Sequence, residues 1–198
     1  MRLESFLSCI ERGEIPNESP DGCYTYGRVA TPYVPYIEAR DICTKHGMWA
    51  IVTKALARDL ASWIGGRAVL EIMSGPGWLA KALHESGVQI GATDNGSWNA
   101  RHSLASILFP VMQMDCTEAV RTIAADVLLV SWPPYGNDAI CHAAELWGKD
   151  RPIIYIGEGC GGCNAPDEFF SRFSYERSDI PLFSWPGLHD DIYIGYYE

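Results

Sequence analysis

The stretch that decides the fold of this 198-residue chain reads Ala68-Val69-Leu70-Glu71-Ile72-Met73-Ser74-Gly75-Pro76-Gly77-Trp78. It begins with a short apolar run that carries one acid, Glu71, and this run predicts a buried strand. Gly75 and Gly77 can adopt backbone angles that are closed to other residues, and without side chains they let a ligand approach the backbone. Helix-forming residues follow, and the start of a helix presents unpaired N–H groups. Strand, glycine turn and helix together predict the first unit of a nucleotide-type α/β fold.

The composition and charge of the chain bear on its class and its partners. Hydrophobic residues make up 47% of the sequence and charged residues 20%, as is typical of a globular protein. The formal net charge is −10, and the 15 Lys and Arg residues are scattered along the chain. Such a surface repels the phosphate backbone of a nucleic acid unless a local basic patch overrides it. The sequence therefore disfavours nucleic acid as a partner.

Signals for secretion or membrane insertion are not evident in the sequence. Glu4 and Glu11 interrupt the first residues, so no apolar core of a signal peptide forms. No apolar run approaches the length of about 18 residues that a membrane-spanning helix needs. The seven cysteines are an odd number, which in the absence of a secretion signal is typical of reduced thiols in the cytosol. We therefore expect a cytoplasmic protein with no membrane partner.

Apolar runs and amphipathic segments alternate along most of the chain. Strands are predicted at residues 68–72, 88–93, 111–114, 126–130, 152–157, 180–184 and 191–197. Helices are predicted at residues 3–10, 37–46, 53–64, 78–85, 98–109, 117–124, 138–147 and 166–173. This alternation predicts a doubly wound α/β fold with a mostly parallel, seven-stranded sheet and helices on both faces. A turn and no helix joins the last two strands, so the last strand should be antiparallel.

The N-terminal part of the chain has a different character. Residues 13–36 are rich in Gly and Pro, which excludes a long helix and predicts a loop or arm. This arm carries Tyr24, Tyr26, Tyr33 and Tyr36. It is either a strap packed on the domain or a lid over a pocket, since tyrosine combines an apolar body with a polar tip. We divide the chain into an N-terminal helix with this arm, residues 1–49, and a main domain, residues 50–198.

Acidic side chains stand at the ends of the first predicted strands. In doubly wound sheets, ligands bind at the carboxyl ends of the strands, near the switch in strand order. Asp94 ends the second strand, and its carboxylate suits the two hydroxyls of a ribose. Asp115 ends the third strand, where it can meet an adenine amino group. Glycines at this spacing also occur in NAD-binding folds, and Ala80 at the third glycine position is tolerated there, so spacing alone leaves NAD open.

Over about residues 50–198 the chain resembles the class I S-adenosylmethionine-dependent methyltransferases, which have a Rossmann-like domain. Their first motif, acid-x-Gly-x-Gly-x-Gly, corresponds to Glu71 through Gly77, with Met73 in place of the first glycine. Asp94 matches the ribose-binding acid of the family, and Asp115 matches the acid beside the adenine. The resemblance implies S-adenosylmethionine as the cofactor and favours it over NAD. The implied cofactor-binding residues are Glu71, Met73, Ser74, Gly75, Gly77, Asp94, Asn95, Asp115, Cys116 and Ser131.

A second stretch, Trp132-Pro133-Pro134-Tyr135, resembles the Asx-or-Ser-Pro-Pro-aromatic motif of amino-methyltransferases. In that family the polar first residue accepts a hydrogen bond from the target amino group, and the aromatic residue stacks on a planar substrate. A Trp side chain donates only, so Trp132 does not carry this chemistry over, and Ser131 lies one place earlier. The implied substrate-binding residues are Trp132, Pro133, Pro134, Tyr135, Tyr33 and Trp49.

The function implied by the resemblance is methyl transfer to a small or planar acceptor, with an amine or oxygen nucleophile. Tyr135 and Glu158 are the candidate catalytic residues. Glu158 could accept a proton or hold a substrate amine, and otherwise it is a helix-capping or loop carboxylate. One alternative is an inactive cofactor-binding or partner-binding module, and a second is a methyltransferase for adenine N6 or cytosine N4 in nucleic acid. The pair Cys160 and Cys163 does not indicate zinc, which needs about four ligands, so we expect no metal.

Overall fold

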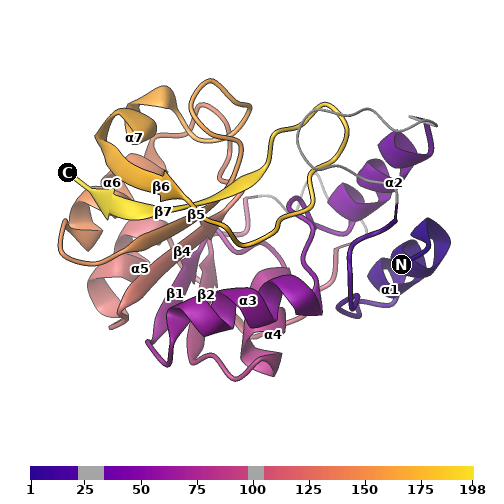
Figure 1. The fold of residues 1–198 in the computed structure, drawn as a ribbon. Coiled ribbons are helices and arrows are strands. Elements are labelled where there is room, and N and C mark those ends of the chain that lie inside the picture. Colours follow the sequence, from indigo (N-terminus) through magenta and orange to yellow (C-terminus); the bar gives the residue numbers. More distant parts are fainter. Residues whose placement is uncertain (22–33, 98–104) are drawn as a thin grey trace.

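The computed structural model describes residues 1–21, 34–97 and 105–198 (Figure 1). The helices are α1 (Leu3–Glu11), α2 (Val34–Lys45), α3 (Lys54–Ile64), α4 (Trp78–Glu85), α5 (Cys116–Thr122), α6 (Ala139–Trp147) and α7 (Asp167–Arg172). The strands are β1 (Val69–Ile72), β2 (Ile90–Asp94), β3 (Val111–Gln113), β4 (Val127–Ser131), β5 (Ile153–Gly157), β6 (Phe173–Arg177) and β7 (Asp191–Tyr197).

The strands form one seven-stranded sheet in the order β3-β2-β1-β4-β5-β7-β6. Neighbouring strands from β3 to β5 pair in parallel, whereas β7 runs antiparallel to both β5 and β6. The chain moves outward from β1 to β3 and then returns to place β4 on the other side of β1. The strand order therefore switches between β1 and β4. The predicted doubly wound, mostly parallel sheet with an antiparallel last strand is confirmed.

Two hydrophobic clusters lie on opposite faces of the sheet, because successive side chains of a strand point to opposite faces. In β1, Val69 belongs to the cluster that packs against α3 and α4, whereas Leu70 belongs to the cluster that packs against α5, α6 and α7. All four residues of β1 are buried, as expected for a central strand covered on both faces. Figure 1 shows α3 and α4 along the lower face of the sheet.

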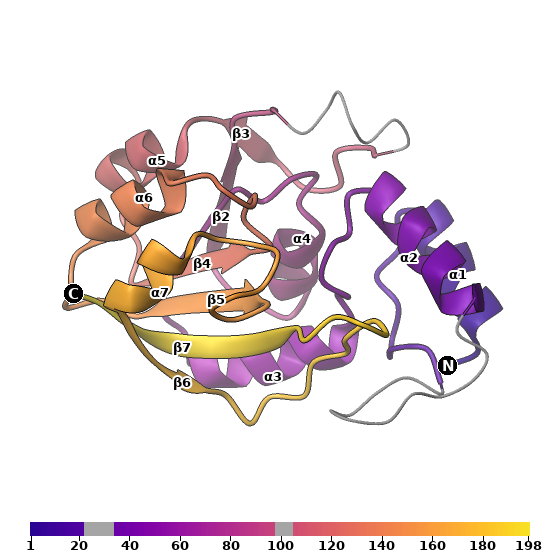
Figure 2. The ribbon, with the colours of Figure 1, turned by 90° about the horizontal axis from the view of Figure 1, so that it is seen from above.

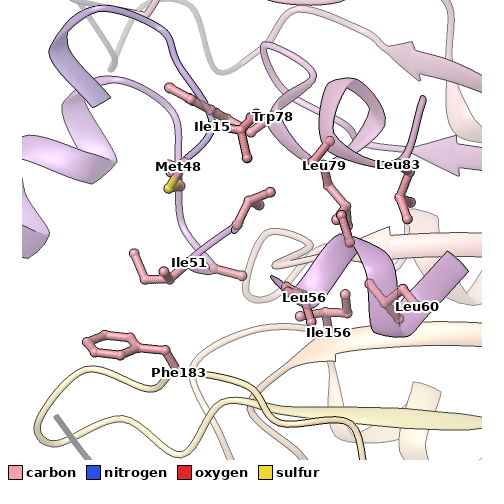
Figure 3. Packing of buried hydrophobic residues seen from close by; sticks show 14 of the residues in the cluster. Ile15, Met48, Ile51, Leu56, Leu60, Trp78, Leu79, Leu83, Ile156 and Phe183 are labelled. Atoms are coloured by element: carbon pink, nitrogen blue, oxygen red, sulfur yellow. The ribbon is translucent and has the colours of Figure 1, made fainter. Parts of the chain in front are cut away.

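The N-terminal helices lie beyond the carboxyl ends of the parallel strands (Figure 2). Phe6 and Ile10 of α1 belong to the same hydrophobic cluster as the α3 and α4 face of the sheet. Figure 3 shows Met48 and Ile51 in this cluster with Leu56 of α3. The cluster also includes Ile15, Leu60, Trp78, Leu79, Leu83, Ile156 and Phe183 (Figure 3). The described residues of the N-terminal part, 1–21 and 34–49, therefore share a core with the main domain.

The closing strand pair differs from the sequence prediction. Residues 180–184 are not a strand, and β6 is formed instead by Phe173–Arg177. Pro181 lacks a backbone N–H and cannot donate to a ladder, whereas Phe173 and Tyr175 alternate with polar residues in the pattern of an edge strand. The predicted helix at 166–173 is consequently shorter: Pro166 is its N-cap residue, and α7 ends at Arg172.

The helix predicted at 98–109 is also wrong in its last part. Residues 105–109 are irregular, and residues 98–104 lie outside the described part of the chain. The Leu108 backbone N–H donates to the Pro76 carbonyl oxygen at 2.9 Å, so this segment is held against the glycine turn. A Cβ atom at Gly77, whose φ is +86°, would lie 2.8 Å from Phe109 Cβ and 3.1 Å from Val111 Cγ2. Gly77 is thus required by packing as well as by backbone angle.

This packing predicts the effect of an added methyl group. We expect Gly77→Ala to lower the free energy of unfolding by about 2–4 kcal/mol, since strain at positive φ adds to the collision with Phe109. Gly87→Ala is the matched control: φ is +87°, but nothing lies within 4 Å of the added Cβ. It should cost about 1–2 kcal/mol, from strain alone. Urea denaturation measures both losses, and equal losses would contradict the packing role of Gly77.

Candidate functional site

A cavity of about 820 Å³ lies at the carboxyl ends of the parallel strands. It is lined by the glycine turn after β1, the ends of β2 and β4, the segment after β3, and residues 47–52 that follow α2. This is the crevice expected where the strand order switches, because the connections from β1 and β4 leave the sheet toward opposite faces. The predicted site residues that line it are Trp49, Glu71, Met73, Ser74, Gly75, Asp94, Asn95, Asp115, Cys116, Ser131, Trp132, Pro133, Pro134 and Tyr135.

Three predicted site residues do not appear in this lining. Gly77 is buried under Phe109 at the start of α4. Glu158 follows β5 and is buried behind the cavity-lining residue Cys163. Tyr33 lies outside the described residues, as do Tyr24 and Tyr26.

Asp94, at the end of β2, is held by two backbone donors. The Gly75 N–H donates to its Oδ2 at 2.9 Å, and the Gly96 N–H donates to its Oδ1 at 2.7 Å. The carboxylate therefore joins the glycine turn after β1 to the loop after β2. Each carboxylate oxygen accepts about two hydrogen bonds, so both retain capacity for a ligand hydroxyl.

The backbone at Met73 explains why glycine suits this position of the motif. Its φ is +54°, in the left-handed region that costs a non-glycine residue about 1–2 kcal/mol. The strained turn is held on its far side by the Ser74 N–H, which donates to the Thr93 carbonyl oxygen at 3.1 Å. The Met73 side chain packs against the cluster on the α5 face and lines the cavity. Met73 thus keeps the turn and adds a side chain that glycine would omit.

Glu71 is a buried acid with one unpaired oxygen. Its side chain is 2% exposed, and its Oε2 has no hydrogen-bond partner. Burial raises the pKa of Glu71 to about 8, with a smaller contribution from the nearby charge of Asp94. Glu71 lines the cavity, and its unpaired Oε2 is itself buried.

Asp115 and Cys116, which the sequence predicted to lie beside an adenine, both line the cavity. Asp115 is the N-cap residue of α5, and its Oδ1 accepts from Thr117 Oγ1 at 2.6 Å and from the Thr117 N–H at 2.8 Å. The hydrogen bonds from Thr117 lower the pKa of Asp115, so it is a carboxylate. Burial raises the pKa of Cys116 to about 11, so Cys116 is a neutral thiol, which donates to the Ala139 carbonyl oxygen at 3.5 Å.

Trp132 dominates the opposite wall of the cavity. Its φ is +51°, and its indole ring stacks on Trp49 with 5.3 Å between centroids and 26° between planes. The indole Nε1 donates to Asp190 Oδ1 at 2.8 Å, and the Arg40 Cζ lies 5.8 Å from the ring centroid. Along the same wall, Pro133 is buried and the Tyr135 side chain is 73% exposed.

Asp190 and Arg40 are the parts of this wall that sequence reasoning missed. Neither belongs to a recognised motif, and Asp190 lies in the connection between β6 and β7, 58 residues after its partner Trp132. The only signal in the sequence was a pair of adjacent acids, Asp190 and Asp191, at the start of the last strand.

Glu158 braces two loops in this structure. Its Oε2 accepts from the Cys163 N–H at 2.9 Å, and its Oε1 accepts from the His189 N–H at 3.0 Å. Burial acts to raise the pKa of Glu158, but these hydrogen bonds outweigh it and lower the pKa. Of the roles considered for Glu158, this geometry favours the loop carboxylate over the proton acceptor.

Within the three described ranges, no group of three or more His, Cys, Asp or Glu residues could hold a metal ion. The helices of those ranges include none with the length and apolar character needed to cross a bilayer.

Comparison with known proteins gives little guidance. No family model matches the chain, and no curated protein matches it. Among solved structures, it is similar to 1,6-didemethyltoxoflavin-N1-methyltransferase of Burkholderia thailandensis, at 14% identity and a TM-score of 0.46, over 93% of this chain and 99% of that chain. It is also similar to magnesium protoporphyrin IX methyltransferase of Synechocystis, at 14% identity and a TM-score of 0.45, over 87% and 88% of the two chains.

A third similar structure is the ribosomal protein L11 methylase of Lactobacillus delbrueckii, at 12% identity and a TM-score of 0.45, over 73% of this chain and 77% of that chain. With TM-scores below 0.5, these likenesses are too slight to establish a function for this chain, which has to be inferred from its own residues.

The burial of Glu71 predicts a pH dependence of stability. Between its ordinary pKa of 4.5 and its folded pKa of about 8, the folded chain holds a proton that the unfolded chain has released. The free energy of unfolding of the wild type should therefore fall as the pH rises through this window, by up to about 1.4 kcal/mol per pH unit. Glu71→Gln removes the part of this dependence that is due to Glu71, whereas the part due to Asp190, whose pKa burial also raises, remains. Denaturation of both proteins from about pH 5 to about pH 8 tests it, and parallel curves would contradict it.

Proposed function

We propose that the protein is an S-adenosylmethionine-dependent methyltransferase that acts on a small or planar acceptor. The observation that carries the proposal is the convergence of two motifs in one cavity. Glu71, Asp94 and Asp115, from the ends of three successive strands, line the same crevice as Trp132 and Tyr135 from the other side of the strand switch. Acids for a nucleoside on one side and an aromatic wall on the other match a donor site beside an acceptor site.

The residues present fit the cofactor. Asp94 would hold the ribose, because both carboxylate oxygens can accept further hydrogen bonds. Asp115 would face the adenine. Glu71 would lie beside the amino-acid end, where its side chain still has an unpaired oxygen for a hydrogen bond. When bound, the cofactor supplies a methyl group on a positively charged sulfonium, and the carboxylates that line the cavity favour a cationic ligand.

NAD fits the same cavity less well. Its pyrophosphate would lie at the start of the helix after the glycine turn, where backbone N–H groups are presented. Here Phe109 covers that position, within 2.8 Å of where a Gly77 Cβ would stand. Among the described lining residues there is no Lys, Arg or His to neutralise the phosphates, whereas there are three acids. The spacing of the glycines left NAD open, and this geometry favours the methyl donor.

The side of the cavity formed by Trp49 and by residues 131–135 supports recognition of the methyl acceptor by shape, and not by the indole N–H of Trp132. The N–H of Trp132 is already donated to Asp190, so the indole has no other polar atom with which to recognise an acceptor. The hydroxyl of Ser131 remains as a polar group at the end of β4 that lines the cavity. Methyl transfer needs chiefly the in-line positioning of the acceptor, so an amine acceptor requires no dedicated base.

An inactive cofactor-binding or partner-binding module is the second candidate. Met73 and Trp132 favour it, because both stand at motif positions where the resembled families have other residues, and both hold a strained positive φ. Binding of the cofactor is common to both candidates. Transfer of a labelled methyl group from S-adenosylmethionine to the small molecules of a cell extract would separate them.

Calorimetry with S-adenosylmethionine and with S-adenosylhomocysteine tests the cofactor site. We expect both to bind, and Asp94→Asn to weaken both by about tenfold or more, because a charged hydrogen-bond acceptor is lost. Asp126→Asn is the matched control, since Asp126 also accepts a backbone N–H, from Ala68 at 2.8 Å, but does not line the cavity. The absence of binding by either ligand at millimolar concentration would refute the proposal.

A further inference from the structure

Three segments that are distant in the sequence meet at the Trp132 ring. Trp132 follows β4, Trp49 and Arg40 come from the N-terminal part of the chain, and Asp190 comes from the connection between β6 and β7. Trp132 and Trp49 line the cavity, whereas Asp190 lies behind them. The ring is therefore fixed at its edge by a hydrogen bond and on its face by a stacked indole.

Asp190 is buried in a way that needs an explanation. Its side chain is 7% exposed, its backbone N–H donates to Ser184 Oγ at 3.0 Å, and its Oδ2 has no hydrogen-bond partner. Burying a carboxyl group with an unpaired oxygen destabilises a fold. Burial raises the pKa of Asp190 to about 7, and the hydrogen bond from Trp132 acts against this rise. The hydrogen bond that Asp190 accepts from the Trp132 indole is thus the contact that accounts for a carboxyl group at this buried position.

The backbone of Trp132 makes this hydrogen bond consequential. The Trp132 N–H donates to the Ile156 carbonyl oxygen at 2.8 Å, so the main chain is still tied to β5. Its φ of +51° then turns the chain sharply, and Pro133 follows directly. A non-glycine residue in this region relaxes unless its surroundings hold it. The hydrogen bond to Asp190 holds the Trp132 side chain at its indole Nε1, the end of the side chain that is distant from the strained backbone.

We propose that Asp190 is a positioning residue, which fixes the Trp132 indole so that the Trp132–Trp49 pair presents a rigid aromatic face to a planar methyl acceptor. This inference rests on the proposed function, which identifies the part of the cavity beside Trp132 as the place where the methyl acceptor binds. The hydrogen bond to Asp190 occupies the only polar atom of the indole. The ring can then contact an acceptor only through its apolar surface. Arg40 of α2, within 5.8 Å of the ring centroid, adds the N-terminal part of the chain to the same wall.

Matched variants separate the hydrogen bond from the charge. Asp190→Asn keeps an oxygen that can accept from the indole, whereas Asp190→Leu removes it and keeps the branched shape of the side chain. Trp132→Phe removes the donor and keeps an aromatic face. Asp191→Asn is the control, because Asp191 is an equally buried neighbouring acid that pairs with Arg177 and accepts from the Ile192 N–H at 2.9 Å.

The first readout is the indole N–H resonance of Trp132 in the ¹⁵N-labelled full chain, identified by its loss in Trp132→Phe. We expect it to move in Asp190→Leu, to stay close to the wild-type position in Asp190→Asn, and not to change in Asp191→Asn. An unchanged resonance in Asp190→Leu would overturn the proposal. This readout needs neither cofactor nor acceptor. It therefore tests the Asp190–Trp132 hydrogen bond even if the protein shows no methyl transfer.

The second readout is the transfer of labelled methyl from S-adenosylmethionine to the small-molecule fraction of a cell extract. Asp190→Leu and Trp132→Phe should each lower transfer by about tenfold or more, because misplacement of the acceptor costs rate. The double variant should be no worse than either single variant, since both remove one contact. Asp190→Asn should retain most of the transfer.

Calorimetry with S-adenosylhomocysteine completes the test. Its affinity should stay within about twofold of wild type in all of these variants, since Asp190 acts on the acceptor side alone. Equal losses of transfer in the Asn and Leu variants, or a loss of cofactor affinity that accompanies the loss of transfer, would overturn the positioning role. A wild type that binds neither S-adenosylmethionine nor S-adenosylhomocysteine would instead refute the proposed function, and leave the Asp190–Trp132 contact to the NMR comparison.

Discussion

The hydrogen bond from the Gly75 N–H to Asp94 is the contact on which the site depends. It joins the turn after β1 to the end of β2 at 2.9 Å, while the Gly96 N–H binds the other oxygen of the same carboxylate at 2.7 Å. The turn passes through positive φ at Met73, Gly75 and Gly77, and such a path needs external support. Asp94 provides that support, and its position at the strand switch also places it in the cavity.

The glycine turn is enclosed from two further sides. A Cβ at Gly47 would lie 2.7 Å from Pro76, and the Trp78 indole donates to the His46 carbonyl oxygen at 2.9 Å. On another side, Leu108 donates to the carbonyl oxygen of Pro76. The turn thus contacts the segment that follows α2 as well as the strands of the sheet. This explains why residues from the N-terminal part of the chain line a cavity that the sheet builds.

Much of the fold and of the cofactor side was predictable from the sequence, because each signal was local. An apolar run followed by glycines or an acid marks the end of a buried strand, and parallel strands bring such ends together. Glu71, Asp94 and Asp115 were found in this way, and all three line the cavity. Their binding of a cofactor stays a prediction.

The remaining features depend on contacts between distant segments, which a single sequence does not display. The packing of Phe109 on Gly77 removed the glycine from the cavity, although its spacing matched a motif. The bracing role of Glu158 requires the N–H groups of Cys163 and His189. The closing strand shifted to Phe173–Arg177 because Pro181 interrupts the alternative. Asp190 was missed because its role depends on a hydrogen bond from Trp132, which lies 58 residues away in the sequence.

We propose that the cavity at the β1–β4 switch holds S-adenosylmethionine with its methyl group directed at Trp132. A crystal structure of the protein with S-adenosylhomocysteine tests this most directly. We expect the ribose hydroxyls to lie within hydrogen-bonding distance of Asp94, the adenine to lie beside Asp115, and the sulfur to face the segment from Ser131 to Tyr135. A ligand bound outside this cavity, or bound with its sulfur turned away from that segment, would contradict it.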